Sequence, residues 1–479
     1  MYDVVIIGCG VIGASAAYEL SKYKLSIAVL EKENDVACGA TRANSAIIHA
    51  GFDPKPGTKM ARLNVLGSRM MGELCEKLSV EYSQIGSLVL AFTEKEMECV
   101  RELYERGGKN QVPGLRILTR DEVLQIEPNV NVEVIGALHA PTAAIINPWG
   151  LCLALAQNAK INGVDIHLNS EVVRISNKGG HYHVETTSGA YDTRYIVNAA
   201  GVYSDKVSDM VAEPFFRITA VKGEYYILDK SQGDIVNYVL FQTPSSVGKG
   251  VLIAPTVHGN LIVGPTSEPT ADPEDTSVSY RGLEEVVKKS MHLCARISFK
   301  ESIRNFAGVR AMGGDDFILE ASAPNFINAA AIKSPGLSSA PAIALEICDL
   351  LKENGLDLIE KDSHTLYKKK PLFKNMRPDE QKKVLELDRR YGRVICRCET
   401  ITEGDIIEAI KAPVPPVSID GVKRRCEAGS GRCQGGFCAP RVHEILSRET
   451  GRAMESICQG KAGSYILTGK TKTPGGGAV

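Results

Sequence analysis

The sequence lacks an excess of either charge. Among its 479 residues, 56 Lys and Arg stand against 57 Asp and Glu, which leaves a formal net charge of −1. This balance argues against a whole-protein attraction to nucleic acid or to an anionic membrane surface, so any basic site must be local. An internal repeat of about 20 to 50 residues is also missing, which excludes a solenoid or a propeller.

We expect neither a targeting signal nor a membrane span. The chain starts at Met1 directly with an apolar stretch, without a basic region or a signal-type apolar segment. Residues 134–159 carry no formal charge, but Pro141, Pro148 and several amide side chains would lie in hydrocarbon if this stretch crossed a membrane. We expect a cytoplasmic protein without a transmembrane segment; peripheral association with the inner face of the membrane stays open.

The thirteen Cys are not typical of a disulfide framework. Their number is odd, and the expected compartment is a reducing one. Five of them fall within 43 residues, a density that favours metal ligation over disulfides. These are Cys396, Cys398, Cys426, Cys433 and Cys438.

A folded protein of two or three domains is predicted from length and composition. The chain has 44% hydrophobic and 24% charged residues, as ordinary globular proteins do. At about 150 residues per domain, its length is too great for a single small binding module.

The first 31 residues have the pattern of a βαβ unit. Residues 3–7 form an apolar run typical of a buried strand, residues 14–22 have helical periodicity, and residues 26–30 form a second strand. The turn between the first strand and the helix has the form G-x-G-x-x-G, at residues 8–13. Its first glycine permits a tight turn, its second lets a pyrophosphate approach the backbone, and its third lets helix and strand pack closely.

Glu31 ends the second strand, where its carboxylate can bond the hydroxyls of an adenosine ribose. Together with the glycine turn it predicts a dinucleotide site, against the alternative of a structural glycine-rich turn. The motif alone does not separate FAD from NAD. A second strand running into small residues, at 195–201, offers another place where backbone approaches the dinucleotide. The nucleotide fold resumes at about residues 164–175, which favours a split domain with a substrate module between its parts.

A loop of small and polar residues, 38–51, suits a position against a flat ring system. His49 is its only imidazole, and a lone His is more often structural than catalytic. The following segment predicts a helix over 59–78 whose apolar stripe is most simply core. The stripe consists of Met60, Leu63, Leu66, Met70, Leu74 and Leu78.

Residues 301–344 contain several patterns that predict local structure. Short buried strands are expected at 317–319 and 326–330, and Arg310 follows a Gly-Val pair. Residues 332–339 form a turn that opens a helix from about Pro341 to Leu351. The amides at this helix start suit a phosphate or the pyrimidine end of a flavin, although capping by Ser338 or Ser339 explains the pattern equally.

The Cys cluster contains two close pairs, Cys396 with Cys398 and Cys433 with Cys438, separated by 34 residues. Zinc sites more often use C-x2-C pairs, whereas a binuclear iron–sulfur cluster takes four thiolates at more varied spacings. We therefore favour iron–sulfur over zinc and over free thiols. Nearby basic residues would offset the negative charge of the ligands, unless they form a plain solvated face; they are Lys423, Arg424, Arg425, Arg432 and Arg441.

Four segments together resemble a known family. They are residues 44–51, residues 53–57, the run Val221–Tyr226 and the turn Ser334–Leu337. With the N-terminal motif, they are similar to the flavin-dependent glycerol-3-phosphate dehydrogenases and oxidases of the D-amino-acid-oxidase-like superfamily, of which L-2-hydroxyglutarate dehydrogenase is a close relative. The Cys unit resembles the 2Fe-2S domain of bacterioferritin-associated ferredoxin, which is found at the C-terminus of anaerobic glycerol-3-phosphate dehydrogenase subunits.

The resemblance implies FAD in the first site and a 2Fe-2S cluster in the second. His49 would be the base or orienting group beside the substrate hydroxyl, and Arg310 would hold the substrate's anionic group. Further substrate contacts would come from Ser45, Lys249 and Ser338. FAD would contact Gly8, Gly10, Ile12, Gly13, Glu31, Lys32, Thr41, Asn44, Ser45, Val172, Ala200, Gly201, Gly336, Leu337 and Ser338. The cluster ligands would be Cys396, Cys398, Cys433 and Cys438, with Cys426 unassigned.

One position departs from the family. Ala331 stands where relatives usually have Gly, just before the turn at Ser334, and a Cβ disfavours positive φ there.

The resulting fold class is α/β. It consists of a Rossmann-like FAD-binding domain of the D-amino-acid-oxidase and glutathione-reductase type, an interleaved α+β substrate domain and a small C-terminal iron–sulfur domain. The expected FAD-dependent oxidoreductase spans 1–360, with its FAD-binding part at about 1–80, 145–210 and 305–360 and its substrate part at about 81–144 and 211–304. A linker at 361–392, a 2Fe-2S-binding domain at 393–449 and a tail at 450–479 follow.

The function that the resemblance implies is oxidation of sn-glycerol 3-phosphate to dihydroxyacetone phosphate by hydride transfer to the flavin. A direct oxidase does not need a cluster, so we favour a dehydrogenase that relays electrons through the 2Fe-2S cluster to a partner subunit or carrier. We also expect an oligomer or a hetero-complex. The alternatives are a dehydrogenase of L-2-hydroxyglutarate or another L-2-hydroxy acid, and an electron-transfer subunit without substrate oxidation of its own.

Overall fold

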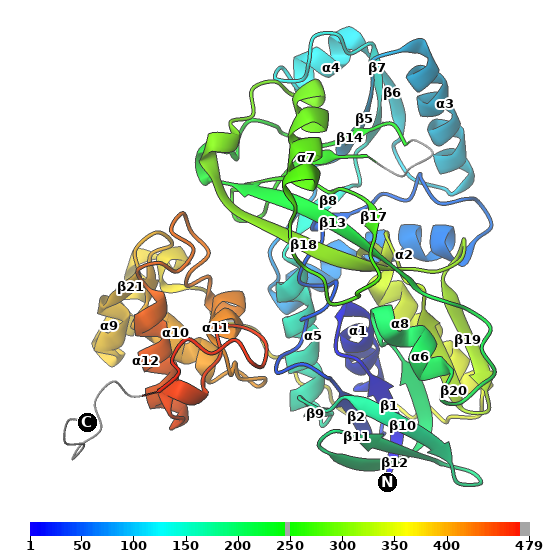
Figure 1. Ribbon diagram of the computed structural model, residues 1–479, viewed down its shortest axis with the longest axis vertical. Coiled ribbons are helices and arrows are strands. Elements are labelled where there is room, and N and C mark those ends of the chain that lie inside the picture. Colours follow the sequence, from blue (N-terminus) through cyan, green and yellow to red (C-terminus); the bar gives the residue numbers. More distant parts are fainter. Residues whose placement is uncertain (245–249, 470–479) are drawn as a thin grey trace, which may run out of the picture. The chain divides into compact units, whose positions relative to one another are not determined.

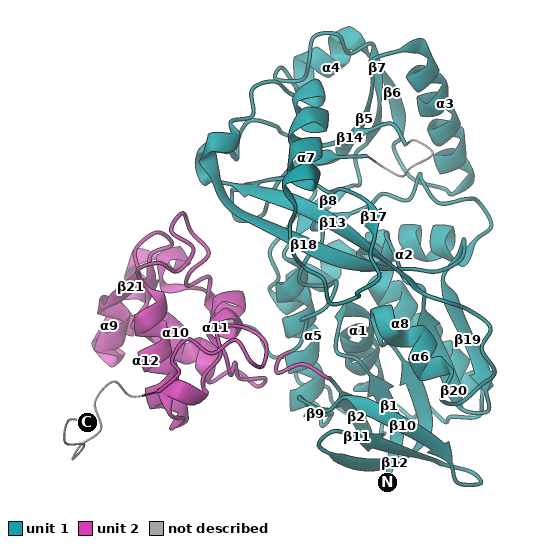
Figure 2. Cartoon of the chain, viewed as in Figure 1, with its two compact units in different colours: residues 1–31, 36–368 teal, residues 32–35, 369–479 magenta. Residues whose placement is uncertain are grey.

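The computed structural model describes residues 1–244 and 250–469 (Figure 1). The chain divides into two compact units (Figure 2). Unit 1 comprises residues 1–31 and 36–368, and unit 2 comprises residues 32–35 and 369–479. The predicted linker at 361–392 is therefore shared between the units, because its first eight residues belong to unit 1 and the others to unit 2.

The N-terminal βαβ unit forms as predicted, with β1 (Tyr2–Ile7), α1 (Val11–Leu20) and β2 (Ile27–Leu30). It lies in an eight-stranded sheet of order β10-β11-β12-β1-β2-β9, to which β20 adds beside β12 and β19 beside β20. The strands β20, β12, β1, β2 and β9 run parallel. The remaining strands of this sheet are β9 (Asp165–His167), β10 (Val172–Asn177), β11 (Tyr182–Thr186), β12 (Gly189–Asn198), β19 (Ile318–Ala323) and β20 (Phe326–Ala330).

Helices α2 (Lys59–Leu78), α5 (Pro148–Ile161), α6 (Ser204–Ser208) and α8 (Gly336–Glu353) accompany this sheet, and α8 packs against both α1 and α2. Helix α2 has the predicted bounds, but its buried face is shifted from the predicted stripe: Leu66 is exposed, whereas Gly67, Met71 and Cys75 are buried. The reason is a close approach to α8, since a Cβ at Gly67 would collide with the backbone of Ser338.

A second, nine-stranded sheet has the order β17-β13-β16-β15-β14-β5-β7-β6, with β18 paired to β13. Strand β18 (Ser302–Met312) is antiparallel to β13 along its length. Arg310 therefore belongs to this sheet, although the predicted boundary at 305 assigned it to the FAD-binding part. The other strands are β5 (Ser87–Ala91), β6 (Arg116–Thr119), β7 (Gly136–Ala140), β13 (Thr219–Leu228), β14 (Val239–Gln242), β15 (Leu252–Pro255), β16 (Leu261–Gly264) and β17 (Glu268–Pro269).

Helices α3 (Glu94–Lys109), α4 (Arg120–Ile126) and α7 (Tyr280–Leu293) pack on the nine-stranded sheet. A small sheet of order β3-β8-β4 lies in the same unit and consists of β3 (Ile47–Ile48), β8 (Ala144–Ile146) and β4 (Tyr82–Ser83). The uncharged stretch 134–159 thus forms β7, β8 and most of α5. Among the described residues, no helix is long and apolar enough to cross a membrane.

Unit 2 is a small helical domain around its own apolar core, in which Ile401, Ile406, Val422 and Leu446 are fully buried. Its elements are α9 (Pro378–Leu387), β21 (Val394–Cys396), β22 (Ile401–Thr402), α10 (Glu403–Ile410), α11 (Ile419–Cys426) and α12 (Ala439–Thr450). Helix α9 lies within the predicted linker.

Candidate functional site

The glycine turn after β1 leaves no room for side chains. Gly8 has a φ of +98°, and a Cβ there would lie 2.6 Å from the carbonyl oxygen of Ala199. A Cβ at Gly13 would collide with the carbonyl of Gly8. The ends of β1 and β12 therefore meet at this turn, and Ala200 and Gly201, which follow β12, lie where the sequence predicted a second backbone approach.

Polar groups converge on the same turn from three further segments. The carboxylate of Glu31 accepts a hydrogen bond from the amide of Cys9 (2.7 Å), and Thr41 Oγ1 accepts one from the amide of Val11 (2.9 Å). The amide of Ser170 donates to the carbonyl oxygen of Glu31 (2.8 Å), which brings the start of β10, at Val172, to this end of the sheet.

Helix α1 begins at the turn, so the amides of its first turn, that of Ile12 included, lack acceptors within the helix. The tight backbone, the helix start and the acid at the end of β2 fit the pyrophosphate and adenosine of a dinucleotide. Lys32, which directly follows Glu31, stays a predicted contact.

A second helix start lies in the same unit. Helix α8 begins at Gly336, five residues earlier than predicted, and Pro341 lies inside it. Its N-cap, Pro335, has no side-chain capping bond, so the capping alternative for Ser338 and Ser339 is wrong. Ala331 adopts a φ of +53°, so its Cβ does not prevent the left-handed conformation and only adds a cost of about 1–2 kcal/mol.

The backbone of His49 is held from both sides. Its amide donates to Ser338 Oγ (2.8 Å), and its carbonyl oxygen accepts from Asn64 Nδ2 (2.8 Å). The imidazole stacks on Phe241 with ring centroids 5.6 Å apart, and its Nε2 lies 3.3 Å from Ser334 Oγ. The ring therefore has a fixed place beside the start of α8, with a hydroxyl within hydrogen-bond distance of its Nε2.

This geometry changes the assignment of two predicted residues. Ser338 is completely buried and its hydroxyl is engaged by the backbone of residues 47–49, so we assign it to holding His49 rather than to contacting substrate. The side chain of Asn44 bonds Ala40, Thr41 and Ala46 and shapes its own loop. Lys249, the other predicted substrate contact, lies outside the described residues.

Ser45 connects the loop 38–51 to the nine-stranded sheet through a side-chain contact. Its hydroxyl lies 3.3 Å from the hydroxyl of Tyr225, a residue of β13 that is almost fully buried and stacks on Phe306 at 4.7 Å. Burial raises the pKa of Tyr225, and the nearby Arg310 and the bond to Ser45 oppose this. The phenol thus stays neutral, and its hydroxyl can donate a hydrogen bond to Ser45 Oγ.

The guanidinium of Arg310 presents a hydrogen-bond donor that a ligand can use. Its Nη2 donates to the carbonyl oxygen of Thr266 (2.8 Å), whereas its Nε is buried and has no hydrogen-bond partner among the described residues. A buried unpaired donor costs about 1–3 kcal/mol unless a ligand satisfies it. A carboxylate or a phosphate would fit this guanidinium, because the planar fork binds such oxygens in pairs.

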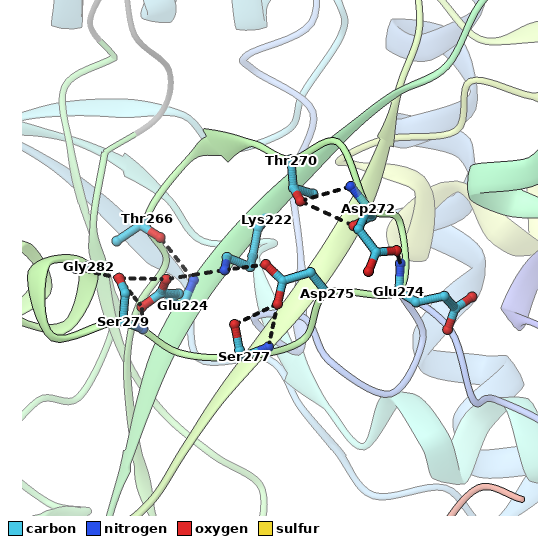
Figure 3. A network of polar contacts seen from close by, with 10 residues as sticks. All are labelled: Lys222, Glu224, Thr266, Thr270, Asp272, Glu274, Asp275, Ser277, Ser279 and Gly282. Carbon is cyan, nitrogen blue, oxygen red and sulfur yellow. Dashed lines mark hydrogen bonds and ion pairs between the residues drawn. The ribbon is translucent and has the colours of Figure 1, made fainter.

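A polar network fixes the carbonyl that holds Arg310 (Figure 3). The hydroxyl of Thr266 accepts from the amide of Glu224 (3.0 Å), and the buried Glu224 carboxylate accepts from the amide (2.9 Å) and hydroxyl of Ser279. Lys222 bonds Asp275 at 2.7 Å and, with bonds from Ser277, lowers the pKa of Asp275 to about 2. The segment from Thr266 to Ser279 is thereby fastened to β13.

Four residues of this site are not predicted from the sequence: Tyr225, Ser334, Phe241 and Thr266. Tyr225 and Ser334 lie within the motifs that carry the family resemblance, but the motifs alone assign them no role. Phe241 and Thr266 gave no signal, because only the pairing of distant strands brings them to His49 and Arg310.

The four predicted cluster ligands form two pairs in unit 2. The sulfurs of Cys398 and Cys433 lie 3.6 Å apart. Two thiolates on one tetrahedral metal, with bonds of about 2.3 Å, would lie about 3.8 Å apart. The thiol of Cys438 bonds the sulfur of Cys396 and, with the amides of Gly429 and Glu399, lowers the pKa of Cys396 to about 6 against the effect of burial.

Two pairs suit a cluster in which each of two irons takes two thiolates. Among the described residues, no group of three or more His, Cys, Asp or Glu side chains is placed to hold a single metal ion. Cys426, which had no assigned role, is buried in the core of unit 2; its thiol donates to the carbonyl oxygen of Val422 (3.4 Å), and burial raises its pKa to about 12.

Comparison with known proteins agrees with both sites. Residues 3–350 match the model of the FAD dependent oxidoreductase family, and residues 394–448 match that of the BFD-like [2Fe-2S] binding domain. A glycerol 3-phosphate dehydrogenase of Caloramator mitchellensis is 49% identical over 477 residues, 99% of each chain. L-2-hydroxyglutarate dehydrogenase of Escherichia coli K12 is 31% identical over 283 residues, which cover 56% of this chain and 64% of that protein.

Among solved structures, the L-alpha-glycerophosphate oxidase of Mycoplasma pneumoniae with FAD bound is similar with a TM-score of 0.73 and 33% identity. The match covers 77% of this chain and 99% of that one. The chain therefore belongs to the FAD-dependent oxidoreductases of the D-amino-acid-oxidase type, binds FAD in unit 1, and carries a C-terminal BFD-like domain for a 2Fe-2S cluster.

Proposed function

We propose that the protein is a dehydrogenase that oxidises sn-glycerol 3-phosphate to dihydroxyacetone phosphate. The observation that carries the proposal is Arg310, whose buried Nε has no partner in the described parts of the chain and which lies near Tyr225, the hydrogen-bond partner of Ser45. Similarity over the whole length to a glycerol 3-phosphate dehydrogenase supports the choice of substrate. The bound FAD supplies the hydride acceptor for this reaction.

In this reaction Arg310 binds the phosphate through Nε and its remaining Nη donors. His49 removes the proton of the secondary hydroxyl through Nε2, which gives up its hydrogen bond to Ser334 Oγ when the substrate hydroxyl binds. Ser338 and Asn64 hold the backbone of His49 so that the ring keeps its place. Phe241 covers one face of the imidazole and keeps water from that side.

We further propose that the electrons leave through the 2Fe-2S cluster one at a time. The BFD-like domain and the two thiol pairs support this, since a direct oxidase would not need a cluster. The acceptor is then a one-electron partner, not dioxygen.

The second candidate substrate is an L-2-hydroxy acid such as L-2-hydroxyglutarate. Arg310 could hold a carboxylate equally well, and the E. coli enzyme of that activity is similar over 56% of the chain. An anaerobic test distinguishes the two substrates. Glycerol 3-phosphate is expected to bleach the flavin absorbance within seconds, whereas L-2-hydroxyglutarate should do so at least tenfold more slowly. Bleaching by the hydroxy acid alone would reverse the assignment, and bleaching by neither would refute both.

Replacement of Gly223 by alanine is expected to weaken substrate binding about tenfold. A Cβ at this position would lie 2.8 Å from Pro265 Cβ and 3.1 Å from Arg310 Nη2, so the guanidinium must move. The apparent dissociation constant for glycerol 3-phosphate, taken from the concentration dependence of flavin reduction, measures this. The limiting rate should change less, because Arg310 binds the substrate and does not take part in proton transfer.

Gly189→Ala is the matched control, because a Cβ at Gly189 would meet no atom within 4 Å. Equal affinities of wild type and Gly223→Ala for glycerol 3-phosphate would show that Arg310 does not bind the substrate.

A further inference from the structure

The two thiol pairs of unit 2 differ in their access to solvent. Cys396 and Cys438 are buried, with 1% and 2% of their surface exposed. Cys398 is exposed and Cys433 is half-buried. In a cluster held by these two pairs, the iron on Cys398 and Cys433 is the one nearer to solvent. An electron that leaves the cluster has its shortest route to the outside there.

Exposed cationic residues surround that pair along the chain. Arg397 and Arg432 immediately precede Cys398 and Cys433, and Arg441 lies in the first turn of α12. No Asp or Glu occurs in residues 429–441. Of the acidic residues nearby, Glu444 bonds Arg441 at 2.8 Å, while Glu399 is buried and bonded to Lys374.

Phe437 stands in the middle of this set with 86% of its surface exposed. Its amide bonds the sulfur of Cys433 together with the amides of Gly435 and Gly436, and these bonds lower the pKa of Cys433. The backbone of residues 434–437 is thus fixed around the thiol while the ring points away from the core. We call Arg397, Cys398, Arg432, Phe437 and Arg441 the cluster face.

We propose that the cluster face docks a small acidic electron-carrier protein, with Phe437 as the apolar anchor and the three Arg as the complementary charges. The proposal rests on the electron relay proposed above. One electron passes from the reduced cluster to one carrier molecule, and no bond forms or breaks. Aromatic and Arg side chains carry much of the energy of such interfaces, and complementary charge accelerates the encounter.

A lipid surface is the less favoured occupant. Anionic lipids would also attract Arg and Phe, but they accept no electron, whereas the exposed thiols lie among these residues. The cluster face therefore combines a docking surface with the point of shortest electron transfer, as a protein carrier requires.

The test measures electron transfer in the reverse direction, from the carrier to the cluster, because this direction needs no substrate. Fully reduced flavodoxin, an acidic one-electron carrier, is mixed with oxidised holoenzyme in a stopped-flow instrument, and its blue one-electron-oxidised form is followed. We expect Phe437→Ala to lower the second-order rate at least tenfold, with rescue by Phe437→Leu. The triple variant Arg397→Gln, Arg432→Gln, Arg441→Gln should lower it by a similar factor and flatten its dependence on salt.

Two surface variants of unit 1 serve as matched controls. Tyr280→Ala removes an equally exposed aromatic ring, and Arg101→Gln removes an exposed charge on α3; both should keep the wild-type rate. The paramagnetic spectrum of the reduced cluster should be unchanged in every variant. Reduction of a small neutral quinone should also be unchanged, because it needs no docking.

Wild-type transfer rates in the cluster-face variants would overturn the proposal. Binding to anionic phospholipid vesicles that Phe437→Ala abolishes, with carrier transfer intact, would overturn it in favour of a membrane surface. The substrate assignment fails separately, if glycerol 3-phosphate leaves the flavin oxidised while flavodoxin still reduces the cluster.

Discussion

Replacement of His49 by alanine is expected to slow flavin reduction by glycerol 3-phosphate about 10²-fold or more. The imidazole is the proposed acceptor of the hydroxyl proton, and general bases of this kind contribute about 10²- to 10⁴-fold. Its ring is held by stacking on Phe241 and by the contact between Nε2 and Ser334 Oγ. Anaerobic stopped-flow reduction at saturating substrate measures the effect.

Two companion variants separate proton transfer from packing. His49→Gln keeps a polar side chain of similar reach but no base, so it should be nearly as slow as His49→Ala. Ser334→Ala keeps the base and loses only its hydroxyl partner, so the rate should fall less than tenfold. The flavin content and the cluster spectrum check that each variant is intact.

A wild-type rate in His49→Ala would show that His49 is not the base. Combined with a flavin that only a partner protein can reduce, that outcome would favour an electron-transfer subunit without substrate oxidation of its own.

The parts of the fold that depend on local pattern could be predicted from the sequence. The βαβ unit follows from a buried strand, a glycine turn and an acid at the end of the next strand, all within the first 31 residues. Helix α2 was predicted with its observed bounds because its apolar residues recur at helical spacing. Its buried face was not, since that depends on the contact of Gly67 with α8, more than 260 residues further along the chain.

The candidate site shows the same limit. His49 and Arg310 could be selected because each lies in a motif, but their surroundings could not. Tyr225 reaches Arg310 only through the long antiparallel pairing of β13 and β18, and Thr266 reaches it through the segment that Glu224 and Ser279 fasten. Such contacts join residues tens to hundreds of positions apart, and no local spacing encodes them.

The segment 32–35 is the least predictable feature of the chain. It follows Glu31 directly, yet it belongs to unit 2, where Asp35 is completely buried. Arg424 Nη2 bonds Asp35 at 2.7 Å, and Arg425 bonds both of its oxygens at 2.8 Å. From their position in the sequence, these two Arg are predicted to offset the negative charge of the cluster ligands. Their partner lies about 390 residues earlier.

Replacement of Asp35 by alanine is expected to destabilise unit 2 by about 3 kcal/mol or more, because two buried guanidinium groups would lose their counter-ion. Burial alone would raise the pKa of Asp35, but Arg425 and Arg424 together lower it to about 2 from an ordinary 3.8. The carboxylate therefore stabilises the fold by about 2 kcal/mol above pH 4, and this stabilisation is lost as the pH falls toward 2.

Denaturant unfolding of the holoenzyme at pH 7, followed by loss of the cluster absorbance, measures the first effect, since this signal reports on unit 2. Asp379→Ala, at an exposed position of α9, is the control and should change the free energy of unfolding by less than about 0.5 kcal/mol.

To measure the pH dependence, wild type and Asp35→Asn are digested with pepsin from pH 5 to pH 2. Wild type should resist more strongly at pH 5, and the difference should vanish toward pH 2. An unchanged denaturant midpoint in Asp35→Ala would mean that the pair contributes no net stability, so that the segment 32–35 would be held in unit 2 by its other contacts, such as the bond from Asn34 to Gly460.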